Sequence, residues 1–268
     1  MLIGRLWGLR RLAAVSLIGA FALSLPAQSE AADAWLKLRR KGIEALLEAS
    51  RDAAAPEPWR ATWQLRDADA GPLKGLQISV RRTKIAARKG KPAAIATVIR
   101  FSGVKSLAGV GVATVGDEVW LRLPGDKGAS PAQGEALFAA LPGIDLPLGL
   151  FAAVGLAGRY EGQIAGEFGG SAIVVLKPRY TDGKGWLRLK LGISKMHLMP
   201  TMAEINDAHG KPLGRWLWLD TRMDKGLMIA NKLRLRTMSR VAPFELELVG
   251  VERGKTVAGL PIGQAALR

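Results

Sequence analysis

The chain contains no cysteine, so it forms no disulfide and has no thiol for catalysis or for N-terminal acylation. Histidine is almost as scarce, with two residues among 268. No H-E-x-x-H pair, no G-x-S-x-G elbow and no glycine-rich phosphate loop ahead of a helix occurs in the sequence. These absences argue against an enzyme, and we expect a protein that has no catalytic residues and needs no cofactor or metal.

Long apolar runs are also rare. The longest, LAAVSLIGAFALSL (12–25), has about 14 residues, fewer than the roughly 20 that span a bilayer. Three arginines precede it, and small residues follow it in PAQSEAADA (26–34). This order is typical of a secretory signal peptide, which we assign to residues 1–31 with cleavage between 27 and 32. We therefore expect an exported, soluble periplasmic protein with one domain over residues 32–268.

Acidic residues are outnumbered, because 39 Lys and Arg compare with 23 Asp and Glu for a formal net charge of +16. The basic excess remains large without the three leader arginines. Such a charge attracts polyanions without specificity. Outside the cytoplasm, anionic lipid headgroups and acidic envelope polymers are present, so we expect anionic headgroups as partners and no nucleic acid.

Periodicity predicts a mainly β protein with a few helices. ADAWLKLRRKGIEALLEASR (32–51) has the pattern of an amphipathic helix. An apolar, alanine-rich insertion at about 125–158 lacks strand alternation and is predicted to be a helical lid. The remaining pattern predicts a single antiparallel sheet, curled on itself, of about 11–12 strands. The predicted strands are 59–65, 76–82, 93–101, 110–115, 118–123, 159–167, 171–179, 185–193, 195–206, 212–220, 226–237 and 244–253.

Several strands have one apolar face and one cationic face. In GWLRLKLGI (185–193), leucines alternate with Trp186, Arg188 and Lys190. The helices are thin cover for so many strands, so we expect an apolar cavity on the concave side. Its predicted lining is Val119, Leu121, Leu187, Leu189, Leu217, Leu219, Leu233 and Leu235, and the predicted lid residues are Leu146, Leu148, Leu150 and Phe151. A register shifted by one residue would turn Trp216 and Trp218 inward instead.

The run KMHLMPTMAEINDAHGKPLGRWLWLD (195–220) resembles a hairpin of the LolA-like outer-membrane lipoprotein-sorting proteins. It shares a proline-containing strand, a D-x-x-G-K-x-L turn and a return strand with them. IRFSG (99–103), VWLRLPG (119–125) and VVLKPR (174–179) are also similar to the family. The resemblance implies an incomplete β-barrel with an N-terminal helix and a helical lid, holding acyl chains without a cofactor. It also implies transfer of a lipoprotein or lipid from an inner-membrane release complex to an outer-membrane acceptor.

Two other functions fit the residues. A non-enzymatic envelope adaptor would pack its sheet entirely on its own helices and bind an acidic partner through its basic face. A hydrolase would need an acid–base pair, and the one grouping available is His197 with Glu204 or Asp207. His197 lies in a predicted strand and His209 in a predicted turn, where a structural histidine is the simpler interpretation.

Overall fold

The computed structural model describes residues 25–53, 55–66, 71–87, 93–116, 118–132, 160–178, 188–207, 209–237 and 243–268. Most of the predicted signal peptide lies outside these ranges. So do Leu187 and the predicted lid residues Leu146, Leu148, Leu150 and Phe151. Among the helices that these ranges contain, none has both the length and the apolar character to cross a membrane.

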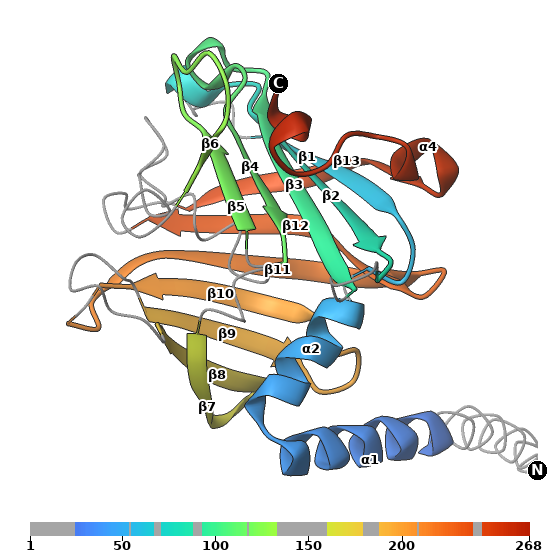
Figure 1. Ribbon diagram of the computed structural model, residues 1–268. Helices are drawn as coiled ribbons and strands as arrows, with labels where there is room; N and C mark the ends of the chain where they lie inside the picture. Colours follow the sequence, from blue (N-terminus) through green and yellow to red (C-terminus); the bar gives the residue numbers. More distant parts are fainter. Residues whose placement is uncertain are drawn as a thin grey trace, which may run out of the picture.

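Thirteen strands form one antiparallel sheet in the described part of the chain (Figure 1). Their spatial order is β6-β5-β4-β3-β2-β1-β13-β12-β11-β10-β9-β8-β7, so the sheet is open and its edges are β6 and β7. The strands are β1 (Trp59–Leu65), β2 (Gln77–Ile85), β3 (Ala94–Ser102), β4 (Gly111–Val115), β5 (Glu118–Arg122), β6 (Ser130–Pro131), β7 (Tyr160–Phe168), β8 (Ser171–Pro178), β9 (Arg188–Ser194), β10 (Pro200–Asn206), β11 (Pro212–Asp224), β12 (Leu227–Thr237) and β13 (Phe244–Arg253). The predicted mainly β, open antiparallel fold is confirmed, with the two-residue β6 as an addition.

The predicted N-terminal helix is two helices, α1 (Leu25–Lys41) and α2 (Ile43–Ala53). Gly42 separates them because its φ of 96° is a left-handed conformation that ends an α-helix. Figure 1 shows α2 in front of the half of the sheet that contains β7 to β10, and Leu46 and Leu47 are buried in the main core. The short helices that the structure describes are η1 (Gly71–Leu73), η2 (Lys105–Leu107), α4 (Lys255–Ala258) and η5 (Gly263–Leu267).

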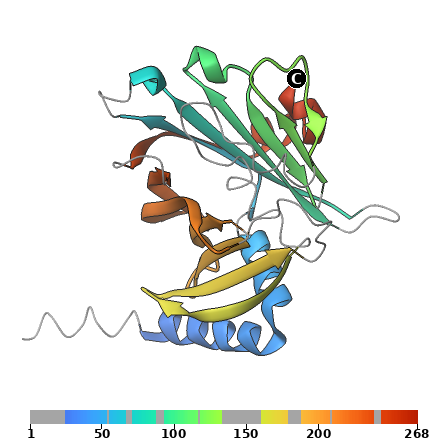
Figure 2. The same cartoon turned by 90° about the vertical axis from the view of Figure 1, so that its left-hand side faces the viewer.

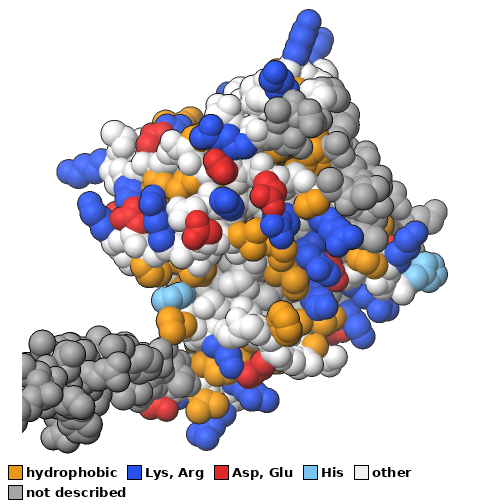
Figure 3. All heavy atoms as spheres, turned by 180° about the vertical axis from the view of Figure 1, so that it is seen from behind, with side chains coloured by type: hydrophobic (Ala, Val, Ile, Leu, Met, Phe, Trp, Pro, Cys, Tyr) orange, Lys and Arg blue, Asp and Glu red, His pale blue; other side chains and the backbone are white. Residues whose placement is uncertain are grey.

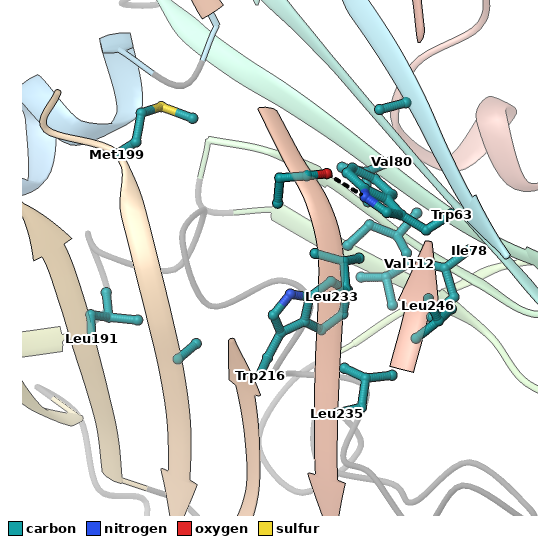
Figure 4. Packing of buried hydrophobic residues seen from close by; sticks show 14 of the residues in the cluster. Trp63, Ile78, Val80, Val112, Leu191, Met199, Trp216, Leu233, Leu235 and Leu246 are labelled. Carbon is teal, nitrogen blue, oxygen red and sulfur yellow. Dashed lines mark hydrogen bonds between the residues drawn. The ribbon is translucent and has the colours of Figure 1, made fainter. Parts of the chain in front are cut away.

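One apolar face runs through the sheet from β5 to β8. Cross-strand partners share a face, so the register identifies its members. Leu189 of β9 lies opposite Leu176 and Ile205, and Trp63 of β1 lies opposite Ile78. All five side chains are buried, and Figure 4 shows residues of both halves packed in one cluster. We call this side the inner face and the opposite side the outer face.

Two halves of the sheet meet at a short ladder. β12 and β13 pair over four positions only, Lys232–Leu235 with Phe244–Glu247. Beyond this ladder, β12 pairs only with β11 and β13 only with β1. Figure 2 shows the two halves inclined to one another. The strands therefore diverge on the Leu227–Asn231 side of the ladder.

The outer face carries charged side chains in cross-strand pairs. The Arg215 Nε–H donates to Glu204 Oε2 at 2.7 Å, and the Arg234 Nε–H donates to Glu245 Oε1 at 2.7 Å. Figure 3, seen from the side opposite α2, shows more Lys and Arg than Asp and Glu. Glu204 is buried beneath its partner, whereas Arg234 and Glu245 are both exposed. An exposed pair of the latter kind contributes about 0–1 kcal/mol, so it affects the surface potential more than stability.

The prediction that His197 lies in a strand is wrong. β10 begins at Pro200 because residues 195–197 form a turn. Leu198 has a positive φ of 55°, and the His197 N–H donates to Ser194 Oγ at 3.2 Å. The Ser194 side chain thus occupies a backbone N–H that a strand would use for pairing. The turn therefore interrupts the strand that the sequence pattern predicted from residue 195. His209 lies in a turn, as predicted.

Candidate functional site

A cavity lies on the inner face, between the two halves of the sheet. Its walls come from β1, β2, β3, β10, β11 and β12, with Met199 ahead of β10. The aromatic and sulfur-containing lining residues are Trp59, Trp63, Met199, Trp216, Trp218 and Met228. The open space is about 40 Å³. That holds about three water molecules and no acyl chain, so an apolar ligand would need side chains to move.

Tryptophans connect the two halves around this cavity. The Trp63 indole N–H of β1 donates to the carbonyl of Ala230 in β12 at 2.8 Å, as Figure 4 shows. β1 and β12 are not neighbours in the sheet, so this bond spans the place where β12 and β13 diverge. On β11, the rings of Trp216 and Trp218 lie 5.5 Å apart with their planes at 31°. Large rings with one polar group each provide an apolar wall with few fixed hydrogen bonds.

Arg82 places a buried positive charge beside this wall. It follows Ile78 and Val80 in the inward phase of β2 and is 7% exposed. Its Cζ atom lies 5.7 Å from the centre of the Trp59 ring, a cation–π contact. Burial lowers the pKa of the Arg82 guanidinium to about 10, so it stays charged at neutral pH. Among the described residues, no salt bridge includes Arg82, and the Trp59 ring faces its guanidinium.

We expect replacement of Arg82 by Met to stabilise the protein. The substitution removes the cost of burying a charge without a carboxylate, and the gain should be about 1–2 kcal/mol after loss of the cation–π contact. Thermal unfolding followed by circular dichroism should show a melting temperature about 2–8 °C higher. Arg222→Met, at an exposed position of β11, should leave the melting temperature unchanged. A lower melting temperature for Arg82→Met would show that the guanidinium is a stabilising element.

Arg253 connects the two halves where the strands have diverged. Its Nη1 lies 2.9 Å from Glu57 Oε1, while its Nη2 lies 2.7 Å from both the Asp224 carbonyl and Asp224 Oδ2. The side chain is 14% exposed, so these bonds are only partly solvated. Arg253 thus connects the end of β13 to the β11–β12 turn and to the segment before β1.

Changing Arg253 to Gln should lower the free energy of unfolding by about 1–2 kcal/mol. Loss of a hydrogen-bonded charge from a fully buried network would cost more, but Glu57 and Asp224 are 40% and 37% exposed and regain hydration. Urea unfolding gives the difference. Lys84→Gln is the matched control because its pair with Asp52 is exposed on both sides. Equal effects of the two substitutions would contradict a connecting role for Arg253.

The predicted lining residues fall into three groups. Val119, Leu121, Leu189, Leu233 and Leu235 lie on the inner face and are buried, but they pack in the core and do not line the cavity. Leu187 lies outside the described residues. Leu217 and Leu219 were placed on the wrong face. Their partners on β12 are Arg234 and Lys232, while Trp216 and Trp218 lie opposite Leu235 and Leu233.

Glu204 and Asp207, the candidate acid–base partners of His197, each make a separate structural contact. Glu204 lies on the outer face and accepts from Arg215. Asp207 Oδ1 accepts from the backbone N–H groups of His209 and Lys211 at 2.9 and 2.8 Å, which stabilises the β10–β11 turn. Within the described ranges, no group of three His, Cys, Asp or Glu is placed to hold a metal ion.

Known structures identify this arrangement. A DUF1329 family protein from Desulfovibrio piger has a TM-score of 0.60 at 14% identity, over 84% of this chain and 99% of that one. A protein described as an outer membrane lipoprotein-sorting protein domain, from Vibrio parahaemolyticus, has a TM-score of 0.53 at 15% identity, over 80% and 93%. The chain has the LolA-like fold.

The LolA-like fold is therefore confirmed at the level of architecture. A LolA superfamily protein from Nitrosomonas europaea is also similar, at 11% identity over 79% of this chain and 93% of that one, with a TM-score of 0.48. No protein-family model matches the sequence, and no curated protein matches it. At these identities, the LolA-like structures are similar in fold, and the residues of this cavity have to be interpreted from their own chemistry.

Proposed function

We propose that the protein is a periplasmic carrier that binds the acyl chains of a lipid or lipoprotein and moves them toward the outer membrane. The observation that carries this proposal is the tryptophan- and methionine-lined cavity between the two halves of an open, LolA-like sheet. The carrier does no chemistry on its cargo. Its partners would be a release complex at the inner membrane and an acceptor at the outer membrane.

The driving force would be burial of methylene groups. Each buried CH₂ contributes about 0.8 kcal/mol, so six to eight of them amount to roughly 5–6 kcal/mol, far more than one surface ion pair. Part of this energy would be used to separate side chains that now fill the space. Met199 and Met228 have flexible, unbranched side chains that repack at low cost.

Opening would occur where the sheet is least connected. Among the described residues, the four-position ladder, the Trp63–Ala230 hydrogen bond and the Arg253 contacts connect the strands of the two halves here. An acyl chain that enters between β1 and β12 would replace the Trp63–Ala230 hydrogen bond by apolar contacts. Arg82 would then supply a positive charge for the ester or anionic end of the ligand.

Quenching by brominated acyl chains tests this directly. Bromine quenches tryptophan fluorescence at short range, and Trp59, Trp63, Trp216 and Trp218 line the cavity. Titration with a dibrominated fatty acid, a brominated phospholipid and a brominated lipopeptide should give saturable quenching for at least one. Trp218→Phe should reduce the quenched amplitude without changing affinity. Absence of saturable quenching with all three ligands would refute the carrier.

A second function is favoured by the charge of the outer face. Arg215 lies directly opposite Arg236 in the β11–β12 ladder, and Lys232, Arg234 and Arg236 follow one another on the same face. An envelope adaptor would use this surface to bind an acidic partner. Its binding would weaken steeply between low and high salt, whereas acyl-chain binding would not.

A further inference from the structure

Three arginines lie side by side on the outer face, away from the cavity. Arg60 of β1 and Arg81 of β2 are directly opposite in the register. Arg100 of β3 lies opposite Ser79, two residues from Arg81 and on the same face. Like charges at such positions destabilise a sheet. The arrangement therefore needs a stabilising partner that the sheet itself does not fully provide.

The C-terminal segment turns this cluster into a pocket. Leu260, Pro261 and Ala266 form one wall, and the three arginines with Ser79 and Val98 form the rest. The open space in this pocket is about 150 Å³, roughly ten times what one water molecule needs. More of its lining residues are polar than in the inner-face cavity.

Packing holds the C-terminal wall in place. Ala266 and Leu267 are buried against Val98 and Ala113. Arg122 Nη1–H donates to the Leu267 carbonyl at 2.9 Å, and Gln264 Nε2–H donates to the Ala129 carbonyl at 2.8 Å. The pocket is thus built from the sheet and from a segment that several contacts fix to it.

The charges of this pocket are only partly balanced. Glu252 is the carboxylate that pairs with the cluster in the described part of the chain, through Arg60 at 3.0 Å between Nε and Oε1. Arg81, 7% exposed, donates to the Pro261 carbonyl, and Arg100 donates to main-chain oxygens of Ala266 and Arg268. Burial, and then the nearby Arg100 and Arg60, lower the pKa of Arg81.

We propose that this pocket binds a phosphate group, either free or on a lipid headgroup. Guanidinium groups bind oxyanions through two parallel N–H bonds, and each carries five donors, more than the main-chain oxygens here use. A phosphate offers three acceptor oxygens and up to two negative charges, which matches three converging arginines. The site lies on the opposite side of the sheet from the acyl-chain cavity, so it is independent of the proposed carrier function.

Calorimetric titration of the whole chain with inorganic phosphate at low ionic strength tests the site. We expect saturable binding of one phosphate, weakened at least tenfold by Arg100→Gln and by Arg81→Gln. Arg236→Gln removes the same charge from an exposed position of β12 and should change the affinity less than twofold. Glu252→Gln removes the competing carboxylate and should tighten binding severalfold, a gain that damage to the fold would not produce.

Vesicle flotation distinguishes the two sources of phosphate. Vesicles of phosphatidylcholine with and without phosphatidic acid are compared for the unchanged protein, Arg100→Gln and Arg236→Gln. Selective loss of phosphatidic acid binding in Arg100→Gln supports a headgroup ligand. Selective loss of inorganic phosphate binding, with unchanged flotation, supports the free ion. If Arg100→Gln and Arg236→Gln weaken both ligands equally, or neither ligand binds, the proposed site is refuted.

Discussion

Trp218→Asp should weaken acyl-chain binding at least 100-fold. Trp218 is half-buried in the cavity wall, and the change removes its ring and places a carboxylate against the ligand. A carboxylate that faces an apolar chain costs roughly 3 kcal/mol, which corresponds to about 100-fold in affinity. Even an ion pair with Arg82 would leave a polar group in the wall. Equilibrium dialysis with a radiolabelled fatty acid measures the affinity.

The neighbouring residue supplies the control. Leu217 is also half-buried on β11, but its side chain lies on the outer face, opposite Arg234. Leu217→Asp introduces the same charge one residue away and should leave acyl-chain binding within about twofold. Circular dichroism must show that both variants fold. Loss of binding in Leu217→Asp alone would mean that the ligand lies on the outer face.

Among the described glycines, substitution of Gly103 by Val should produce the largest loss of stability. Gly103 follows β3 with a φ of 80°, and a Cβ atom there would lie 2.0 Å from the carbonyl oxygen of Gly75. Gly75 itself has a φ of 87°, so both turns use conformations that favour glycine. A side chain at Gly103 would therefore push two backbone segments apart.

The expected loss is about 2–5 kcal/mol, the sum of roughly 1–2 for the left-handed conformation and 1–3 for the clash. For a chain of this size, that lowers the melting temperature by about 4–20 °C. Gly210→Val is the control, because Gly210 has a φ of 85° with no atom within 4 Å of its Cβ position. Gly210→Val should lose only the roughly 1–2 kcal/mol that the left-handed conformation costs. Equal shifts in the two variants would contradict a close contact between Gly75 and Gly103.

Alternation along the chain was enough to predict most of the sheet. β1 was predicted with its observed bounds, and the other predicted strands were found within a few residues, apart from the start of β10. Strand alternation reports a local property, namely which side chains point the same way. It also placed Leu189 and Leu191 on the buried face and Arg188 on the exposed one.

The faces of β11 needed long-range information. In RWLWLD, tryptophans and leucines alternate, so both faces are apolar and the pattern does not select one. Pairing of Trp216 with Leu235, 19 residues along the chain, decides the orientation. Trp216 and Trp218 point inward, which is the alternative that the sequence pattern left possible.

Arg82 was missed although the sequence contained a signal. It breaks the inward phase of Ile78 and Val80 with a charged residue, whereas a strand that only packs in a core would continue with an apolar one. The arginine cluster of Arg60, Arg81 and Arg100 was also not predicted, because it depends on the register of three strands and on the position of the C-terminal segment.

Native mass spectrometry of the protein purified from a periplasmic extract tests the carrier function most directly. We expect a mass above that of the protein alone, with an adduct that dissociates as a lipid or a lipidated peptide. The adduct should be absent from Trp218→Asp and present on Leu217→Asp. An unliganded mass for the unchanged protein, with no uptake of added phospholipid or lipopeptide, would contradict the carrier and favour the envelope adaptor.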